Sequence, residues 1–312
     1  MKVLQSLVFF LIFPGFLFTA IFGLITTWID RKVTAKLQWR VGPPFAQPFY
    51  DVVKLLGKEN LIPKNAEPIV FILAPMLGLA SITIVSLVLW LANITNSSFI
   101  GDLIVISYLL LIPSLALMLG GFASGNPLAV TGASREMKLI LGYELPYLFI
   151  LLTVIVKSGL SIQLTALHNH AAILSVSGII AFLVALLCIQ AKLGLLPFDL
   201  AEAETELMEG AYIEYSGTLF AIYKLTQAMA LFTLPVFLIT LFLGGMKFTG
   251  WGIVFTLLKF LVILVLIIVI KNTNPRIRID QGVKFFWLYL TPLAVIALIL
   301  AVIGSIYNIS WL

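Results

Sequence analysis

The stretch that decides the fold is WGIVFTLLKFLVILVLIIVI, from Trp251 to Ile270, in which Lys259 is the only charged residue. A helix needs about 20 mostly apolar residues to cross the hydrocarbon layer of a bilayer, so this run predicts a transmembrane helix. The whole chain of 312 residues is 61% hydrophobic and 11% charged. Soluble domains are about 45 to 50% apolar and about 25% charged. The composition excludes a soluble globular domain and a disordered chain, and predicts a protein embedded in lipid.

Seven further apolar runs are separated by clusters of charge. Together the runs predict an all-α polytopic membrane protein, with about eight transmembrane helices in a single membrane domain that covers residues 1–312. The predicted spans are Gln5 to Trp28, Ile69 to Leu91, Leu103 to Gly125, Lys138 to Val156, Ala171 to Gln190, Thr218 to Leu243, Trp251 to Ile270 and Phe285 to Ile306. Prolines inside four spans free backbone carbonyls that neighbouring helices must satisfy, which predicts a packed bundle.

The basic residues set the orientation. Fourteen of the 19 lysines and arginines follow the first, third, fifth and seventh spans, and three lie on the other side. The positive-inside rule therefore predicts a multi-pass protein of the cell membrane with both termini outside. All carboxylates except Asp102 share the basic side. We expect the inner loops 30–68, 126–138, 191–217 and 271–284 to form a docking face for a cytoplasmic partner. Nucleic acid is not expected, because its sites are basic without such acids.

Residues that bind metals or cofactors are scarce. The single cysteine, Cys188, cannot hold an iron–sulfur cluster or form an internal disulfide. His168 and His170 share one loop, which we interpret as solvated, with a metal site as the less favoured alternative. No phosphate-binding loop is present. We therefore assign no catalytic, metal-binding or cofactor-binding residue to this chain, and expect any redox centre in a partner.

The first inner loop contains an amphipathic pattern. Apolar residues recur there at helical spacing, at Phe49, Val52, Val53 and Leu56. Charged residues fall on the opposite side, at Asp51, Lys54 and Lys58. The pattern predicts a helix that lies in the membrane interface, with a simple surface helix as the alternative.

Acidic residues near the lipid are the strongest functional signal. Glu144 lies about two turns into the predicted fourth span, where an ionised carboxylate costs about 2.5 to 3.5 kcal/mol, so it should be paired, neutral or hydrated. Six acids without an intervening base follow the fifth span: Asp199, Glu202, Glu204, Glu206, Glu209 and Glu214. If residues 199–209 are helical, four of these acids form one stripe. Burial and repulsion would raise their pKa values, as a proton relay requires; a solvated acidic face is the alternative.

Three other groups of charges need a partner. Lys224 lies within the sixth span and could snorkel to the interface. Lys259 is near mid-span, so we expect it to face another subunit or water. Arg276, Arg278 and Asp280 could bind anionic lipid or pair with the acidic segment.

Four motifs taken together resemble the H-type membrane subunit of respiratory complex I, the NADH dehydrogenase subunit 1 family. They are DRK at 30–32 with RVGP at 40–43, Arg135 with GYE at 142–144, LLPFDLAEAETELMEGAYIEYSG at 195–217, and NTNPRIRIDQ at 272–281. The resemblance implies a junction between a cytoplasmic electron-transfer arm and antiporter-like membrane subunits. Together with the pattern of charges it predicts ion coupling by Glu136, Glu144, Asp199, Glu202, Glu204, Glu206, Glu209, Glu214, Lys224 and Lys259. The predicted arm-docking residues are Arg31, Lys32, Arg40, Arg135, Arg276, Arg278 and Asp280.

Several departures look like the membrane-bound energy-converting nickel–iron hydrogenases and their sulfur-reducing relatives. The loop PPFAQP at 43–48 is short, Leu195 and Leu196 stand where an arginine is usual, and Glu136 directly follows Arg135. This branch implies a ferredoxin-linked oxidoreductase complex that moves protons or sodium. Its hydrogenase-like electron-transfer subunits would hold the nickel–iron centre and iron–sulfur clusters. The alternatives are a quinone-binding complex I subunit, the equivalent subunit of a sulfane sulfur reductase, a stand-alone ion transporter and a passive anchor.

Overall fold

The computed structural model describes residues 8–168, 170–202, 204–307, 309 and 311. Every regular element within these residues is a helix. Seven stretches are long and apolar enough to span a membrane: Val8–Leu37, Pro68–Thr95, Asp102–Ala123, Pro127–Lys157, Gly217–Phe242, Gly252–Thr273 and Ile279–Ile306. An eighth apolar helix, Val176–Lys192, has 17 residues. The predicted all-α polytopic fold, with about eight membrane helices, is confirmed.

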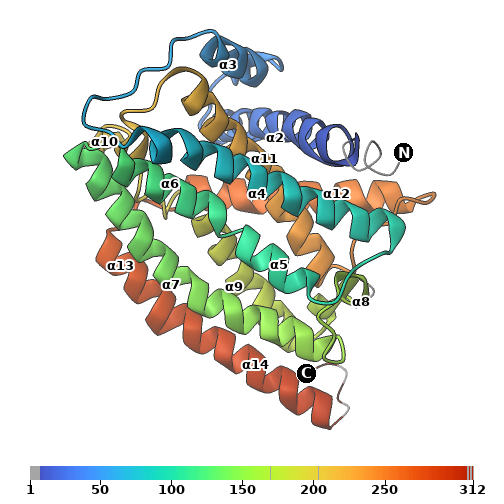
Figure 1. The fold of residues 1–312 in the computed structure, drawn as a ribbon. Helices are drawn as coiled ribbons and strands as arrows, with labels where there is room; N and C mark the ends of the chain where they lie inside the picture. Colours follow the sequence, from blue (N-terminus) through green and yellow to red (C-terminus); the bar gives the residue numbers. More distant parts are fainter. Residues whose placement is uncertain (1–7, 169, 203, 308, 310, 312) are drawn as a thin grey trace.

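The elements follow one another as shown in Figure 1. The long helices are α2 (Phe16–Leu37), α4 (Pro68–Thr95), α7 (Pro127–Lys157), α9 (Val176–Lys192), α11 (Gly217–Phe242), α12 (Gly252–Thr273) and α14 (Thr291–Ile306). The third span consists of α5 (Asp102–Leu109) and α6 (Ile112–Ala123), and the last begins with α13 (Ile279–Lys284) and a π-helical segment, Phe285–Leu290. Short helices are α3 (Gln47–Leu56), α8 (Leu164–His168) and α10 (Glu204–Leu207), with 3-10 turns at Ala172–Leu174 and Gly210–Tyr212.

Helix α11 forms the centre of the bundle. Every residue from Ala228 to Phe242 is buried, and the helix packs on α2 and α4. Helix α7 packs on α6, α9 and α14. The outer helices instead expose large apolar side chains such as Leu257 and Leu288. Extended apolar exposure of this kind marks a lipid-facing surface.

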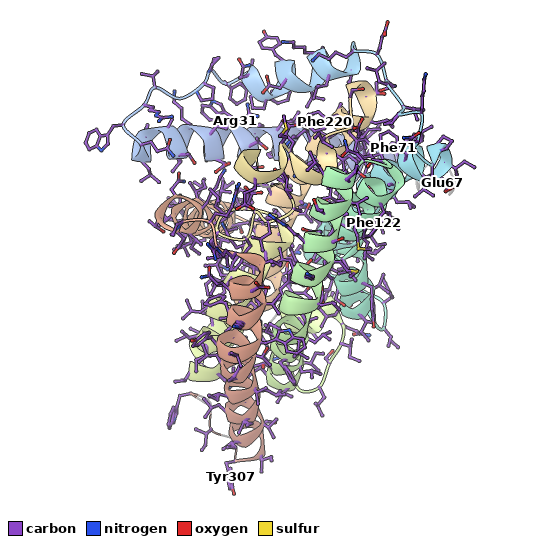
Figure 2. All side chains as sticks on the ribbon, turned by 90° about the vertical axis from the view of Figure 1, so that its left-hand side faces the viewer. Arg31, Glu67, Phe71, Phe122, Phe220 and Tyr307 are labelled. Atoms are coloured by element: carbon purple, nitrogen blue, oxygen red, sulfur yellow. The ribbon has the colours of Figure 1, made fainter. Side chains whose placement is uncertain are left out.

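The bundle has two ends. Figure 2 shows Arg31 and Glu67 at one end and Tyr307 at the other, with α2 and α3 lying across the bundle at a steep angle to α14. We call the end that carries α3, α10 and the connection 274–278 the charged face. The opposite face carries the connections 96–101, 158–175 and 243–251. Which face is cytoplasmic stays a prediction.

Helices extend beyond the predicted spans on the charged face. Helix α2 continues to Leu37, and α7 already begins at Pro127, so residues 127–138 are helical and not a loop. Asn126 caps α7, because its side chain accepts a hydrogen bond from the backbone N–H of Leu128 at 2.9 Å, and Pro127 favours the first turn. Glu144 therefore lies about five turns into α7, at 3.6 residues per turn, instead of two. Hydropathy cannot find these ends, because the helices project past the apolar layer.

The predicted interfacial helix is present as α3. Val53 and Leu56 of the predicted apolar stripe are exposed, as a helix lying on lipid requires. Asp51 is turned toward α2, where it meets Arg31. This ion pair attaches the helix to the bundle, and the apolar Val52 lies on the same side of α3 as Asp51.

The solvated loop expected around the two histidines is wrong for His168. His168 ends α8 and is buried, and its Nε2 lies 3.3 Å from the carbonyl oxygen of Met246, whereas His170 is exposed. Burial lowers the pKa of His168 below its ordinary value. Among the residues that the structure describes, no group of three or more His, Cys, Asp or Glu side chains is placed to hold a metal ion.

Candidate functional site: a buried row of charged side chains

A cavity of 360 Å³ lies near the charged face, between α2, α3, α11 and the segment 193–202. We call it the first cavity. Its walls combine apolar residues such as Leu24 and Phe220 with a set of polar ones: Asp30, Arg31, Asp51, Glu202, Lys224 and Gln227. A cavity with this lining can hold water beside ionisable groups.

One wall is closed by an ion pair between α2 and α3. Arg31 Nη1 lies 2.7 Å from Asp51 Oδ2, and Gln47 donates to Asp51 Oδ1 at 2.9 Å. Burial alone would raise the pKa of Asp51, but these hydrogen bonds and the charge of Arg31 lower it below its ordinary value. Asp51 is therefore ionised at neutral pH, and Arg31, predicted to dock the arm, is part of the cavity wall.

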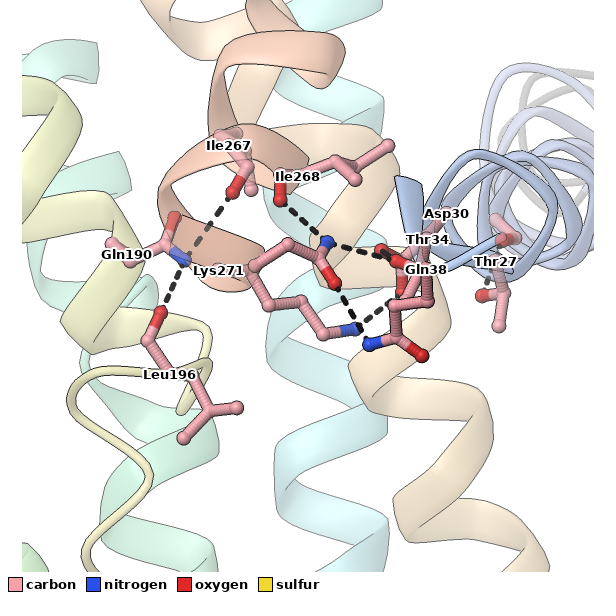
Figure 3. Close-up of polar contacts among 11 residues, drawn as sticks. Thr27, Asp30, Thr34, Gln38, Gln190, Leu196, Ile267, Ile268 and Lys271 are labelled. Atoms are coloured by element: carbon pink, nitrogen blue, oxygen red, sulfur yellow. Dashed lines mark hydrogen bonds and ion pairs between the residues drawn. The ribbon is translucent and has the colours of Figure 1, made fainter. Parts of the chain in front are cut away.

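A second ion pair, next to the first cavity, joins α2 to α12 (Figure 3). The buried Asp30 accepts from Lys271 Nζ at 2.7 Å, and Asn272 donates to Thr34 Oγ1 at 3.0 Å. Nearby, Gln190 Nε2 donates to the carbonyl of Leu196 at 2.7 Å and so holds the segment after α9 in place. Asp30 and Lys271 had no predicted site role, because the two partners are far apart along the chain.

A second cavity of 50 Å³ lies next to the first and shares Leu193, Gly194, Glu202 and Gln227 with it. Its other polar lining residues are Ser114, Glu136, Lys192, Asp199 and Tyr212. Gln227 Nε2 donates to Glu202 at 2.5 Å and to the Tyr212 hydroxyl at 3.0 Å. Burial raises the pKa of Tyr212 well above its ordinary value, so the phenol keeps its proton. Glu202 thus stands at the boundary between the two cavities.

Beyond this boundary, α7 and α9 place charges inside the bundle. Glu136 on α7 is 4% exposed. Lys192, at the end of α9, forms an ion pair with Glu144, and its side chain is only 1% exposed. Its Nζ also lies 4.8 Å from the ring centroid of Tyr143 and 4.3 Å from that of Tyr147. Charges this deep in a membrane domain persist only when they are paired or hydrated.

We call Glu202, Glu136, Lys192 and Glu144 the charged row. Glu202 faces both cavities, Glu136 and Lys192 line the second, and Glu144 extends the row along α7 through its pair with Lys192. The row places three carboxylates and an ammonium group along a path from the charged face into the bundle. Such groups can take up and release protons in sequence.

The predicted arm-docking residues partly converge on the charged face. A pocket of 270 Å³ there is lined by Arg135, Glu206, Arg276, Arg278 and Asp280 together with Leu200, Ile277 and Ile279. We call it the surface pocket. Arg135 pairs with Glu206 at 2.7 Å, and Arg276 pairs with Asp199. The predicted pairing of the acidic segment with the 271–284 segment is therefore confirmed. Since Asp199 also lines the second cavity, this pair connects the surface pocket to the charged row.

The predicted acidic stripe is wrong. Of the described residues between 199 and 209, only Glu204–Leu207 is helical, and the N–H of Ala211 meets the carbonyl of Ala201 at 3.4 Å. A straight helix would separate residues 201 and 210 by about 13 Å. Gly210 permits this fold-back, because it has a φ of +54° and a Cβ there would lie 1.8 Å from the carbonyl oxygen of Ala201.

The acids of this segment therefore have separate environments. Asp199 and Glu202 point inward, Glu206 lies on Arg135, and Glu209 is exposed. Arg135 lowers the pKa of Glu206, which is the reverse of the predicted rise. The side chain of Glu204 lies outside the described residues. Glu214 accepts from Asn126 Nδ2 at 2.5 Å, next to the start of α7.

The remaining predicted residues are not members of the row. Lys224 lines the first cavity, with its Nζ 5.3 Å from the ring centroid of Tyr212 and 5.2 Å from that of Phe220. Lys259 lies near the opposite face, where it donates to the carbonyls of Leu243 at 2.6 Å and Gly245 at 3.3 Å. The side chain is partly exposed, so the expectation that Lys259 also faces water or another subunit stays a prediction. Lys32 Nζ lies 3.5 Å from the Gly42 carbonyl, and Arg40 is exposed.

Lys192, Gln227 and Ser114 are site residues that were not predicted. A signal existed for Lys192, because it is a lysine directly at the end of an apolar run. Gln227 gave only a weak signal, an amide inside a span. No pattern in the sequence linked them, since Lys192 and Glu144 are 48 residues apart.

The chain is a polytopic helical bundle with a charged face, a polar cavity and a buried charged row. These features place it in the class of membrane proteins that carry ionisable groups inside the bilayer. The NADH dehydrogenase family profile matches residues 9–302. The H subunit of the NADH-quinone oxidoreductase of Thermomicrobium roseum is 35% identical over 300 residues, covering 86% of this chain and 87% of that protein. The corresponding H subunit of Geobacillus thermodenitrificans is 34% identical over 313 residues, covering 93% of both chains.

A solved structure is similar to this chain over almost its whole length. A chain of the membrane-bound sulfane sulfur reductase, an archaeal respiratory membrane complex, superposes with a TM-score of 0.84 at 27% identity, covering 96% of this chain and 99% of that one. The chain therefore belongs to the NADH dehydrogenase family, as the H-type subunit of a complex I-like membrane oxidoreductase complex. Its relatives are parts of multisubunit assemblies, so other subunits accompany it.

Proposed function

We propose that this chain anchors the electron-transfer arm of a ferredoxin-linked complex of the hydrogenase or sulfane reductase type, and couples electron transfer to the movement of protons or sodium ions. The observation that carries the proposal is the charged row, which leads from the first cavity into the membrane domain. The charged face would be cytoplasmic, with both termini outside. Hydrogenase-like subunits with the nickel–iron centre and iron–sulfur clusters would dock there, and antiporter-like subunits would adjoin in the membrane.

The first step takes place at the surface pocket. Electron arrival in a docked subunit changes the charge above Arg135, Arg276 and Arg278. Arg276 holds Asp199, and Asp199 lines the second cavity, so a change in this ion pair alters the field at Glu202 and Glu136. Two sites that bias one another in this way are coupled, and the coupling is reciprocal.

The second step takes place in the row. Glu202 exchanges a proton with the first cavity, and Gln227 and Tyr212 hold its carboxylate in place. Protonation of Glu136 removes a negative charge near Lys192, which strengthens the hold of Glu144 on that ammonium group. The state of the Lys192–Glu144 pair then biases the ionisable groups of an adjoining membrane subunit. Each transfer needs only groups that already line the same cavity or form an ion pair.

The ferredoxin-linked assignment is supported by the departures around residues 43–48, 136 and 195–196, together with the fold shared with the sulfane sulfur reductase chain. An assembled complex in liposomes provides the test. We expect Glu202→Gln to keep electron transfer but to lose most of the ion uptake per electron. Glu209→Gln is the matched control, because Glu209 is exposed and away from the cavities. Full coupling in Glu202→Gln would refute the relay.

A quinone-binding role is the second candidate, because the first cavity combines apolar walls with polar groups and two relatives are named as H subunits of NADH-quinone oxidoreductases. A photoreactive quinone analogue distinguishes the two functions. Labelling of the purified complex at Leu24 or Phe220, competed by unlabelled quinone, would favour quinone binding. Absence of such labelling, with ferredoxin-driven turnover intact, is the result that our proposal predicts.

A further inference from the structure

A large apolar hollow lies away from the charged row. It has a volume of 620 Å³ and lies between α2, α4, α11 and α12. Aromatic rings pack around it: the Phe22 and Phe232 ring centroids are 5.5 Å apart, and those of Phe232 and Phe260 are 5.4 Å apart. We call it the aromatic slot. All four helices belong to the membrane-spanning stretches.

The walls of the slot offer water almost nothing to bind. Its lining is apolar except for the hydroxyls of Thr26 and Thr256 and the single indole N–H of Trp90, and both hydroxyls already donate within the chain. Thr26 donates to the carbonyl of Gly23 at 2.8 Å, and Thr256 to that of Lys247 at 3.2 Å. A buried water needs about two to four polar partners, whereas an apolar cavity of about 150 Å³ takes benzene. The slot is about four times that size, so it fits a hydrocarbon chain.

The slot is open toward lipid. Ile253 and Leu257 of α12 line it and are 46% and 58% exposed. Since α12 is a membrane-spanning helix, these exposed side chains face acyl chains of the bilayer. A hydrocarbon chain can therefore enter from the side.

Two lysines stand at the end of the slot near the opposite face. Lys247 is exposed and lies between Met246 and Phe248, which both line the slot. The N–H of Lys247 donates to Thr256 Oγ1 at 3.1 Å, which fixes this residue beside α12. Lys259 lies about one turn after Thr256 on α12, and its ammonium group donates to the carbonyls of Leu243 and Gly245.

These two cations have no counter-ion within the described part of the chain. None of the ion pairs formed there includes Lys247 or Lys259. The one side-chain carboxylate near the opposite face within the described residues, Asp102, is buried and accepts from the N–H of Leu164 at 2.9 Å. Two positive groups above an apolar slot match an amphiphile with an anionic head and a hydrocarbon tail.

We propose that the aromatic slot binds one membrane lipid with an anionic, phosphate-bearing headgroup. One tail fills the slot between α2 and α12, and the phosphate accepts hydrogen bonds from the ammonium group of Lys247 and from a remaining N–H of Lys259. Phe18, Phe22 and Ile29 of α2 line the slot, and Asp30 and Arg31 of the same helix line the first cavity. The lipid thus holds in place the helix that forms one wall of the functional site.

Native mass spectrometry of the full chain, delipidated in detergent and titrated with phosphatidylglycerol or phosphatidylcholine, tests this site. We expect one phosphatidylglycerol per chain to bind with an affinity about fivefold higher than phosphatidylcholine for each lysine engaged. Lys247→Gln should reduce that preference by about fivefold. Equal affinities for the two lipids in the wild-type protein would overturn the proposal.

A pair of neighbouring substitutions on α12 separates the slot from the general lipid surface. Leu257→Trp fills the slot and should abolish the bound phosphatidylglycerol. Leu258→Trp is the matched control, because Leu258 is 55% exposed but does not line the slot. Retention of the lipid in Leu257→Trp to the level of Leu258→Trp would refute the site. If Leu257→Trp does not fold, Ile253→Trp makes the same comparison, and Lys247→Gln tests the headgroup independently. An uncharged isoprenoid as occupant would bind independently of Lys247 and would also overturn the proposal.

Discussion

The charged row and the aromatic slot lie against different parts of the same central helix. Helix α11 places Gln227 beside Glu202 of the row, and contributes Phe232 and Val236 to the slot. Within the row, Lys192 has Glu144 as its partner and Glu202 has Gln227. The slot has apolar walls, and its two lysines stand at its end, with Lys259 bound to backbone carbonyls. In both regions another helix or loop meets the charged group: Glu144 meets Lys192, Gln227 meets Glu202, and backbone carbonyls meet Lys259.

The two regions should also respond differently to substitution. In the row, loss of one group leaves its partner buried and uncompensated. In the slot, substitution changes lipid binding with little effect on the fold, because several wall residues are already exposed. The following changes test this difference.

The largest effect is expected for Lys192→Met. Its removal leaves Glu144 without a cation inside the bundle, and breaking a buried pair in this way destabilises by about 3 to 5 kcal/mol. Thermal unfolding of the purified chain, followed by fluorescence-detected size exclusion, measures the loss. Glu144→Gln added to Lys192→Met should recover much of it, because the uncompensated charge is gone. Lys284→Met, at an exposed lysine, is the control, and equal melting of the two lysine variants would contradict the account.

A smaller effect is expected for Gly210→Ala. The added Cβ would lie 1.8 Å from the carbonyl oxygen of Ala201, so the fold-back that separates the acids must open. Gly194→Ala is the matched control, since Gly194 also has a positive φ, of +61°, but open space around it, and should cost about 1 to 2 kcal/mol. The melting temperatures of the two variants, and their binding to partner subunits, measure the difference between them. Equal behaviour of the two variants would show that the Ala201–Gly210 contact is not needed.

The smallest effect is a pH dependence on the opposite face. Burial lowers the pKa of His168, so the unfolded chain binds a proton more readily than the folded chain. Stability is therefore fully present above the unfolded pKa of about 6.5, and falls as the pH drops below it toward the folded pKa. Melting temperatures between about pH 5 and about pH 8 should show this fall. His168→Gln should flatten the curve, and His170→Gln should leave it unchanged; an unchanged curve in His168→Gln would contradict burial as its cause.

Much of the fold could be predicted from the sequence, because lipid imposes one requirement on every span. A run such as Trp251 to Ile270 must be helical to satisfy its backbone in hydrocarbon, so hydropathy alone locates it. Hydropathy does not locate helix ends that lie outside the apolar runs. It stopped the first span at Trp28 and began the fourth at Lys138, whereas α2 continues to Leu37 and α7 begins at Pro127.

The candidate site was predictable as a set of residues but not as an arrangement. Charge counts identified Glu136, Glu144 and Glu202, because acids beside apolar runs are conspicuous. Their order could not follow from helical spacing, since the fold-back at Gly210 overrides it. The Lys192–Glu144 pair could not be predicted either, because it joins two helices whose paired residues are 48 positions apart. Tertiary packing decides both features.

The most direct test of the central claim is the number of ions moved per electron in the assembled complex with Glu136→Gln, with Glu209→Gln as control. Glu136 is 4% exposed and lines the second cavity next to Lys192, whereas Glu209 is exposed. The account predicts that Glu136→Gln keeps the electron-transfer rate and loses most of the ion movement, while Glu209→Gln keeps both. Unchanged ion movement per electron in Glu136→Gln would contradict the account.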